Sequence, residues 1–214
     1  MNKQTGFTLI ELAIVLVIIG LLLGGVLRGQ ELINSAKVKN MARDFQNVQV
    51  YIYGYQDKYR ALPGDDLAAV AHVGATANQA GAGAGNGVIG GNWDSTTITE
   101  ESAIFWQHVR LAGLAPGPTV VGAGGYYPTN ADGGRIGVQS IAGATNVPTL
   151  PAPMSGAYVI CSAGILGKFA KQLDTTLDDS NTQTGSLRVY TAATGWDINA
   201  TVLDAGVFNV CMAF

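Results

Sequence analysis

Apolar residues run almost without interruption from position 6 to position 27 and then give way to a periodic pattern. The uninterrupted segment reads GFTLIELAIVLVIIGLLLGGVL. As a helix rising about 1.5 Å per residue, it is long enough to cross the roughly 30 Å core of a bilayer. Its one ionisable side chain is Glu11. A carboxylate in hydrocarbon costs at least about 2–3 kcal/mol, so Glu11 is a candidate functional residue.

The periodic pattern predicts that the helix continues well beyond the apolar segment. Apolar positions recur in alternating steps of three and four, which is typical of the buried stripe of an amphipathic helix. The stripe consists of Val38, Met41, Phe45, Val48, Ile52, Tyr55 and Tyr59. A Leu-Pro-Gly sequence at residues 62–64 ends it. The sequence therefore predicts one helix from about Phe7 to Arg60. A coiled coil is the alternative for the stripe, although about three heptads are few for one.

Two shorter helices are predicted in the region after the long helix. Asp65 or Asp66 is expected to cap a helix at residues 67–73, because short acidic side chains are favoured N-caps. Residues 99–111 form the second predicted helix, which presents Ile, Phe, Trp, Val and Leu for packing. Gly113 suits the end of this helix, with a proline just beyond.

The last part of the chain predicts an antiparallel sheet. Residues 115–156 are rich in Gly and Pro and are expected to form irregular loop with short strands. Strand-like runs follow at residues 157–161, 187–191 and 207–212. Helical spacing covers residues 165–177. The predicted fold class is α+β, with a long N-terminal helix, its first half transmembrane, packed on a C-terminal antiparallel sheet.

Composition and charge restrict the function classes. Only 13% of residues are charged, 48% are hydrophobic, and the net charge is −3. A chain that binds nucleic acid usually carries a basic patch, so nucleic acid is not an expected partner. Cys161 and Cys211 are the two cysteines. An oxidising compartment would favour their pairing, and two free buried thiols are the alternative.

Two places offer oxygen ligands for a hard cation such as Ca²⁺. The first is a low-complexity Gly/Ala loop at residues 74–92, which offers Asn86 and Asn92, with Asp94 just beyond. The second place is an acidic group formed by Asp174, Asp178, Asp179 and Asn181. A flexible loop at the first and solvated turns and caps at the second are the alternatives. Calcium is the one cofactor for which the sequence gives any indication.

Catalytic chemistry is not predicted. His72 and His108 are the only histidines, neither has the spacing of a metal motif, and each lies beside apolar residues in a predicted helix. Packing is therefore the expected role of both. The sequence contains no G-x-S-x-G elbow, no Walker loop and no Cys-x-x-Cys pair. We expect a protein that is not an enzyme.

The short leader before the apolar segment needs its own explanation. A secretory signal peptide has small residues after an apolar region of about 7–15 residues. Here the small residue, Gly6, precedes the apolar run, and the run continues into amphipathic helix. A plain membrane anchor would need neither Gly6 nor Glu11. Lys3 lies on one side of the run and three basic residues follow on the other, so charge does not decide the orientation.

Residues 6–12, Gly-Phe-Thr-Leu-Ile-Glu-Leu, resemble without a gap the motif of type IV prepilins and pseudopilins. The resemblance implies that a prepilin peptidase cuts between Gly6 and Phe7 and methylates the new amino group of Phe7. It also implies that Glu11 pairs with the amino terminus of a neighbouring subunit, and that the head lies in the periplasm. The proline often found near the end of the anchor in this family is absent here, which puts the usual kink in doubt.

The resemblance divides the chain into a leader at residues 1–6, a transmembrane and assembly helix at 7–27, an amphipathic half-helix at 28–60 and a globular head at 61–214. The expected function is a structural subunit of a type IV pilus or related filament, assembled from the bacterial inner membrane onto the cell surface. Its expected partners are the peptidase, other pilin subunits, an inner-membrane assembly platform and lipid. A pseudopilin of a type II secretion system, or a minor tip pilin that binds a surface or DNA, is the alternative.

Overall fold

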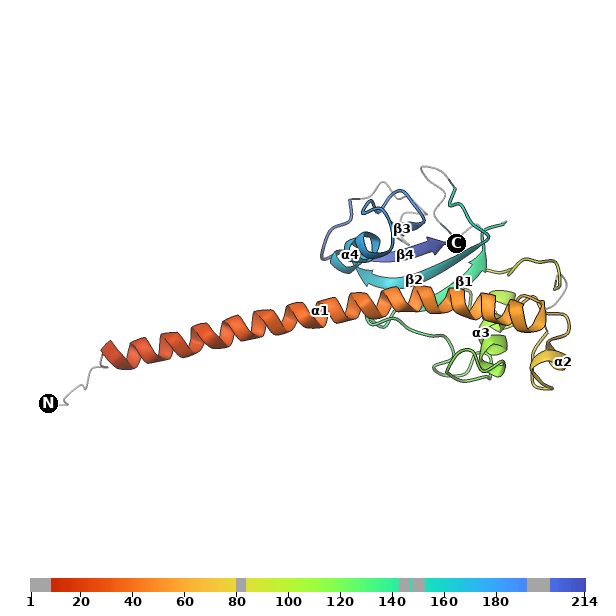
Figure 1. Cartoon of the computed structure of the whole chain (residues 1–214), viewed down its shortest axis with the longest axis horizontal. Coiled ribbons are helices and arrows are strands. Elements are labelled where there is room, and N and C mark those ends of the chain that lie inside the picture. The colour runs from red at the N-terminus through yellow and green to blue at the C-terminus, as the bar shows by residue number, and fades with distance from the viewer. Residues whose placement is uncertain (1–8, 80–83, 143–146, 148–152, 192–200) are drawn as a thin grey trace. The chain divides into compact units, whose positions relative to one another are not determined.

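The computed structural model describes residues 9–79, 84–142, 147, 153–191 and 201–214. The chain divides into two compact units, Met1–Lys37 and Val38–Phe214. Helix α1, Leu9–Tyr59, begins in the first unit and ends in the second (Figure 1). The division at Lys37 lies within the stretch predicted as the amphipathic half of the helix.

The predicted long helix is confirmed over the described residues. The stripe residues of α1 are buried except Tyr59, which is half-buried. They pack against the sheet and the other helices of the same head, which favours the amphipathic interpretation over a coiled coil. Arg60 follows with a φ of 56°, and a left-handed residue there stops the helix before the Leu-Pro-Gly sequence.

The predicted antiparallel sheet is also confirmed. It contains β1 (Ile136–Ser140), β2 (Tyr158–Leu166), β3 (Leu187–Tyr190) and β4 (Val207–Ala213). The strand order is β1-β2-β4-β3, and every neighbouring pair is antiparallel. Strand β1 is one of the short strands expected between residues 115 and 156. The fold is thus α+β and pilin-like, with a long apolar N-terminal helix followed by a four-stranded sheet.

Strand β2 is longer than its sequence pattern predicted. It continues past Cys161 to Leu166, so Ile165 is a strand residue that pairs with Phe208 and not the start of a helix. The register shifts between Ser162 and Ile165, and Gly164 has a φ of 70° there. This bulge adds residues to the strand without losing the pairing with β4. Helix α4 (Gly167–Leu177) therefore begins later than position 165.

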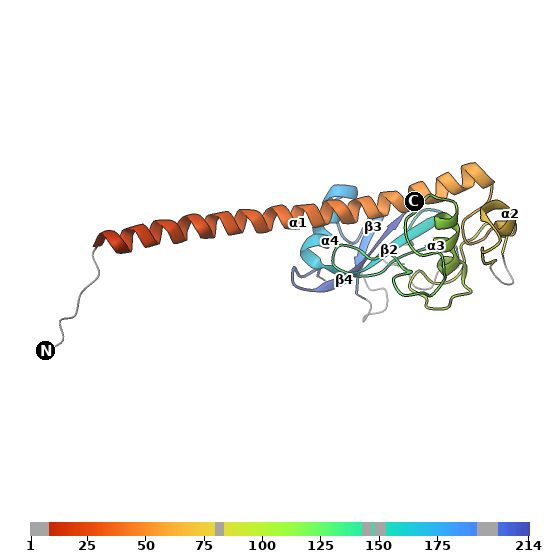
Figure 2. The same cartoon turned by 90° about the horizontal axis from the view of Figure 1, so that it is seen from below.

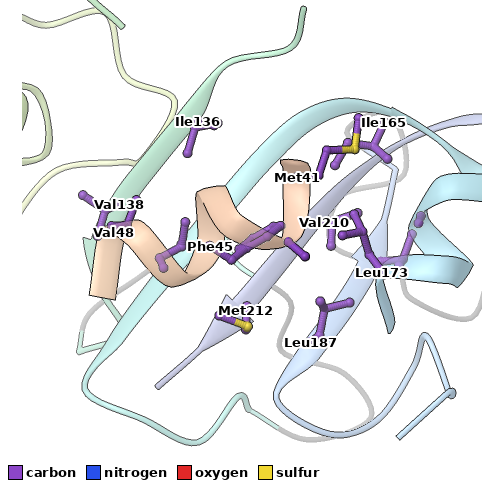
Figure 3. Packing of buried hydrophobic residues seen from close by; sticks show 14 of the residues in the cluster. Met41, Phe45, Val48, Ile136, Val138, Ile165, Leu173, Leu187, Val210 and Met212 are labelled. Atoms are coloured by element: carbon purple, nitrogen blue, oxygen red, sulfur yellow. The ribbon is translucent and has the colours of Figure 1, made fainter. Parts of the chain in front are cut away.

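One hydrophobic core joins α1 to the sheet (Figure 3). Met41, Phe45 and Val48 of the helix meet strand residues such as Val138 and Val210. Burying a side chain of this size contributes roughly 1.5–3 kcal/mol. The α1 residues of the head core therefore come from the C-terminal half of the helix, and among the described residues the first of them is Val38.

The short helices occupy the two ends of the head. Helices α2 (Ala69–Val73) and α3 (Glu101–Leu111) lie near the end of α1, and α4 lies at the opposite end of the sheet (Figures 1 and 2). Ala68, and not an aspartate, is the N-cap residue of α2, and it makes no side-chain cap. The predicted capping is nevertheless found one turn earlier, because the Asp66 carboxylate accepts the Ala68 amide. Both aspartates also bind groups from other segments, as described below.

Candidate functional site

The apolar half of α1 is the most unusual surface of the protein. Every described residue from Leu9 to Leu27 is exposed in the single chain. By length and composition, α1 is the one helix among the described residues that could cross a membrane, and its apolar stretch lies near the N-terminus. Exposed apolar patches on soluble monomers are rarely larger than a few hundred Å², so this surface indicates contact with lipid or with other protein.

Glu11 lies in the first turn of α1. The N-terminal turn of a helix carries partial positive charge, which favours a carboxylate at this position. Gly6 and Phe7, the predicted cleavage and methylation residues, lie outside the described residues. Their roles, and the pairing of Glu11 with a neighbouring subunit, therefore remain predictions from the motif.

Three glycines on the apolar segment have no packing reason within the chain. A Cβ added to Gly20, Gly24 or Gly25 would meet nothing within 4 Å. Each glycine weakens the helix by roughly 1 kcal/mol relative to Ala. Small residues four apart allow helices to approach closely in membranes. Packing within the single chain therefore does not explain these glycines.

Comparison with known proteins agrees with this segment. The family model of the prokaryotic N-terminal methylation motif matches residues 1–27. This motif is the class III signal of type IV prepilins and pseudopilins, a class of precursors anchored by an N-terminal apolar helix. The chain accordingly carries the signal of a type IV pilin-like or pseudopilin precursor. No curated protein and no solved structure matches the chain.

The head is closed by a disulfide between its two central strands. Cys161 of β2 and Cys211 of β4 are directly opposite each other in the sheet, with their Cα atoms 4.1 Å apart, and their sulfurs are bonded. The alternative of two free thiols does not apply in this structure. In the chain-entropy account, closing a loop with a sequence separation of 50 contributes about 4 kcal/mol.

Asp66 connects three segments at the end of α1. Its carboxylate accepts hydrogen bonds from Tyr55 Oη at 2.7 Å, from His72 Nδ1 at 2.7 Å and from the Ala68 amide at 2.9 Å. Burial acts to raise the pKa of Asp66, but the bonds from His72, Tyr55 and Ala68 together lower it below its usual value. Asp66 is therefore a structural carboxylate that holds α2 against α1.

The histidines have the packing roles expected from sequence. His72 is the Asp66 partner just described, and its ring stacks on Tyr59. His108 is fully buried, where Nδ1 accepts the Gly64 amide and Nε2 donates to the Asn78 carbonyl. Burial lowers the pKa of His108, which agrees with a neutral ring in this tautomer.

The first calcium candidate is organised by Asp65. The amides of Gly85, Asn86 and Gly87 donate to the Asp65 carboxylate, which therefore acts as the anion in a cradle of backbone N–H groups. The Asn86 side chain accepts the Val88 amide and shapes the same turn. The amide of Asn92 donates to Glu100, and the Asp94 carbonyl accepts from Arg135. Calcium binding here stays a prediction.

The second candidate is the more compact group. One oxygen each from Asp174, Asp178 and Asp179 lie within 4.8 Å of one another, and among the described residues this is the sole such cluster of His, Cys, Asp or Glu. Asn181 turns its side-chain oxygen to the Gln183 amide. Burial, followed by repulsion from Asp179 and Asp178, raises the pKa of Asp174 to about 6.

Sequence reasoning missed a small cavity of about 200 Å³ between α1 and α3. Asp44, Trp106 and Arg110 line it. Burial raises the pKa of Asp44 to about 6 and lowers the pKa of Arg110, whose guanidinium donates to the carbonyls of Pro116 and Pro118. The sequence pattern places Asp44 on the polar face of the helix, and this position does not predict that the side chain is partly buried.

Proposed function

We propose that the protein is a structural subunit of a type IV pilus or a related filament. The supporting observation is the combination of a matched methylation signal with the exposed apolar segment of α1, residues 9–27, which the head core does not use. A surface of this kind can be buried first in lipid and then among identical helices in a fibre. The role is structural and not catalytic.

Maturation prepares this helix for assembly. A prepilin peptidase cuts after Gly6 and methylates the amino group of Phe7, which then begins the mature helix. In the fibre, Glu11 of one subunit pairs with the amino group of Phe7 on a neighbour. A buried charge is tolerated when paired and strongly penalised when not, so the pair selects one register of packing. The glycines at 20, 24 and 25 let the helices approach closely.

The head is exported and covers the outside of the fibre. The Cys161–Cys211 disulfide supports this location, because disulfides persist in oxidising compartments such as the periplasm. Before assembly the subunit resides in the bacterial inner membrane, where lipid surrounds residues 7–27. An assembly platform in that membrane then moves it into the filament.

A pseudopilin of a type II secretion system is the alternative role, and a minor tip pilin is the next. The head from residue 38 onward is large for a major pseudopilin, and its disulfide leans toward pilins. Immunogold labelling of surface filaments distinguishes these roles. Label along the filaments supports a major subunit, and label only at their ends supports a tip subunit. If no surface filaments are labelled and deletion of the gene abolishes protein secretion, the protein is a pseudopilin.

A substitution at Glu11 tests the assembly mechanism. Glu11→Val removes a charge from the bilayer, so insertion and cleavage after Gly6 should be normal. It leaves the amino group of Phe7 without its partner in the fibre, at a cost of roughly 3–5 kcal/mol per subunit. We expect few or no filaments by electron microscopy. Glu31→Val is the matched control, since Glu31 is exposed beyond the apolar segment and pairs with the exposed Arg28.

The control variant should assemble, because exposed pairs contribute little. Abundant filaments of normal length in the Glu11→Val strain would show that the carboxylate is dispensable and would refute the pairing mechanism. A loss of filaments in both variants would instead point to a general defect of the helix.

A further inference from the structure

The loop between α4 and β3 brings three carboxylates together on the head. Asp174 lies in the last turn of α4, Asp178 is the C-cap residue, and Asp179 follows in the turn. One oxygen from each lies within 4.8 Å of the others. Asp174 is fully buried, Asp178 is half-buried and Asp179 is exposed, so the group is open to solvent on one side.

Asp174 is the residue that points to a ligand. Its side chain has 0% exposure, and neither carboxylate oxygen has a hydrogen-bond partner. Buried polar groups in folded proteins are hydrogen-bonded in the large majority of cases. A buried carboxylate without a partner is more costly than an amide or hydroxyl, so a positive group at this position would stabilise the ionised side chain.

The C-terminal end of α4 adds further negative charge around Asp174. A helix C-terminus carries partial negative charge, and cations are favoured there. The last turn of α4 contains no basic residue and instead contains Asp174. The guanidinium of Arg188 attracts Asp178 electrostatically. Its single charge balances one carboxylate of three, and the remaining two charges match a divalent cation.

The geometry of the group fits Ca²⁺. Calcium binds oxygens at about 2.3–2.6 Å, so two of its ligands can be up to roughly 5 Å apart. Asp178 is held by the Ser186 hydroxyl at 3.1 Å and the Leu187 amide at 2.8 Å. Asp179 accepts the Asn181 amide at 2.9 Å and the Thr184 hydroxyl at 2.8 Å. These bonds fix both carboxylates while leaving lone pairs for a cation.

We propose that Asp174, Asp178 and Asp179 bind one Ca²⁺ ion, with water completing the coordination on the exposed side. The affinity expected is that of extracellular calcium modules, about 10⁻⁴–10⁻³ M. The ion would tie the end of α4 to the start of β3, because the Leu187 amide is bonded to Asp178. This function is independent of filament assembly.

The experiment uses the full mature chain in detergent, stripped with EGTA. Calorimetric titration with CaCl₂ should show one ion per chain, and MgCl₂ should bind at least about tenfold more weakly, since Mg²⁺ demands near-ideal octahedral geometry. At a tenfold excess over Kd, Ca²⁺ should raise the Tm by about 3–6 °C. Asp174→Asn should reduce Ca²⁺ affinity at least about tenfold and should remove this shift.

Asp174→Asn should fold, because it removes a buried charge, and without Ca²⁺ it should melt no lower than the wild type. If that variant misfolds, the test uses Asp179→Asn at the exposed position, which should show the same loss of Ca²⁺ affinity. Asp57→Asn, an exposed aspartate on α1, is the matched control and should leave the Ca²⁺ response unchanged. The proposal is overturned by a wild type without calcium heat or Tm shift, by equal Mg²⁺ binding, or by an unaltered Ca²⁺ response in Asp179→Asn.

Discussion

The hydrogen bond between Tyr55 and Asp66 should make a large contribution to the stability of the head. Tyr55 is fully buried and donates to Asp66 Oδ2 at 2.7 Å. Hydrogen bonds to charged groups contribute about 1.5–3 kcal/mol. Tyr55→Phe keeps the ring, which packs on Tyr59 and stacks on His108, and removes the hydroxyl alone. We therefore expect a loss of about 2 kcal/mol in the free energy of unfolding.

The matched control is Tyr53→Phe on the same helix. Tyr53 is 54% exposed, so loss of its hydroxyl should change stability by less than about 0.5 kcal/mol. Denaturant unfolding of the mature protein, followed by tryptophan fluorescence, measures both variants. Asp66→Asn and the double variant complete a cycle, in which the coupling energy between the two side chains should be about 1.5–3 kcal/mol.

The coupling should also depend on pH in a defined direction. The pKa of Asp66 is lowered in the folded state, so its stabilising effect is present above its unfolded pKa of about 3.9. It is lost as the pH falls through the lower folded pKa. The coupling energy between Tyr55 and Asp66 should thus be the same at neutral and mildly acidic pH. It should fall only when the pH drops through the lowered folded pKa of Asp66. If Tyr55→Phe behaves like Tyr53→Phe, Asp66 does not hold the end of α1 in the way described.

Three further outcomes are expected. Gly6→Val should block cleavage, whereas mass spectrometry of assembled wild-type protein should find methylated Phe7 at the N-terminus; finding Met1 there would refute processing. The thiols of Cys161 and Cys211 should resist labelling in unreduced exported protein, and ready labelling of both would contradict the disulfide. Asp44→Asn should stabilise the head near neutral pH by about 1 kcal/mol, the two-unit rise in pKa being discounted for solvent screening. Because a raised folded pKa destabilises the ionised form, wild-type stability should approach that of the variant as the pH falls below 6, and a pH-independent difference would be inconsistent with this origin.

Local patterns in the sequence predict much of this fold. The helix stripe, the three strands after residue 156 and the cysteines are visible because periodicity and residue type report directly on burial. The methylation motif is a contiguous run of residues, so it needs no knowledge of the fold. The candidate assembly residue Glu11 is found for the same reason, as a lone charge in an apolar segment.

Long-range contacts explain what the sequence could not predict. Asp66 resembles a helix cap locally, but it also accepts a hydrogen bond from Tyr55 of the preceding helix. Strand β2 extends past its expected end because β4 supplies pairing across a bulge. The burial of Asp174 depends on how α4 packs on the sheet, which no local pattern reveals. In each case a tertiary contact overrides the preference of the segment.

The strand order β1-β2-β4-β3 has a consequence for the export proposed above. Strand β4 follows β3 in the chain but lies between β2 and β3 in the sheet. On the proposed route, β2 and β3 would each lack β4 as a neighbour until residues 207–213 had crossed the membrane. Cys161 likewise waits for Cys211. A head that crosses from its N-terminal end onward would therefore expose two unpaired strand edges during translocation, and such edges invite pairing with other chains. Tethering in the bilayer by the first helix would keep each emerging head apart from free chains during this interval.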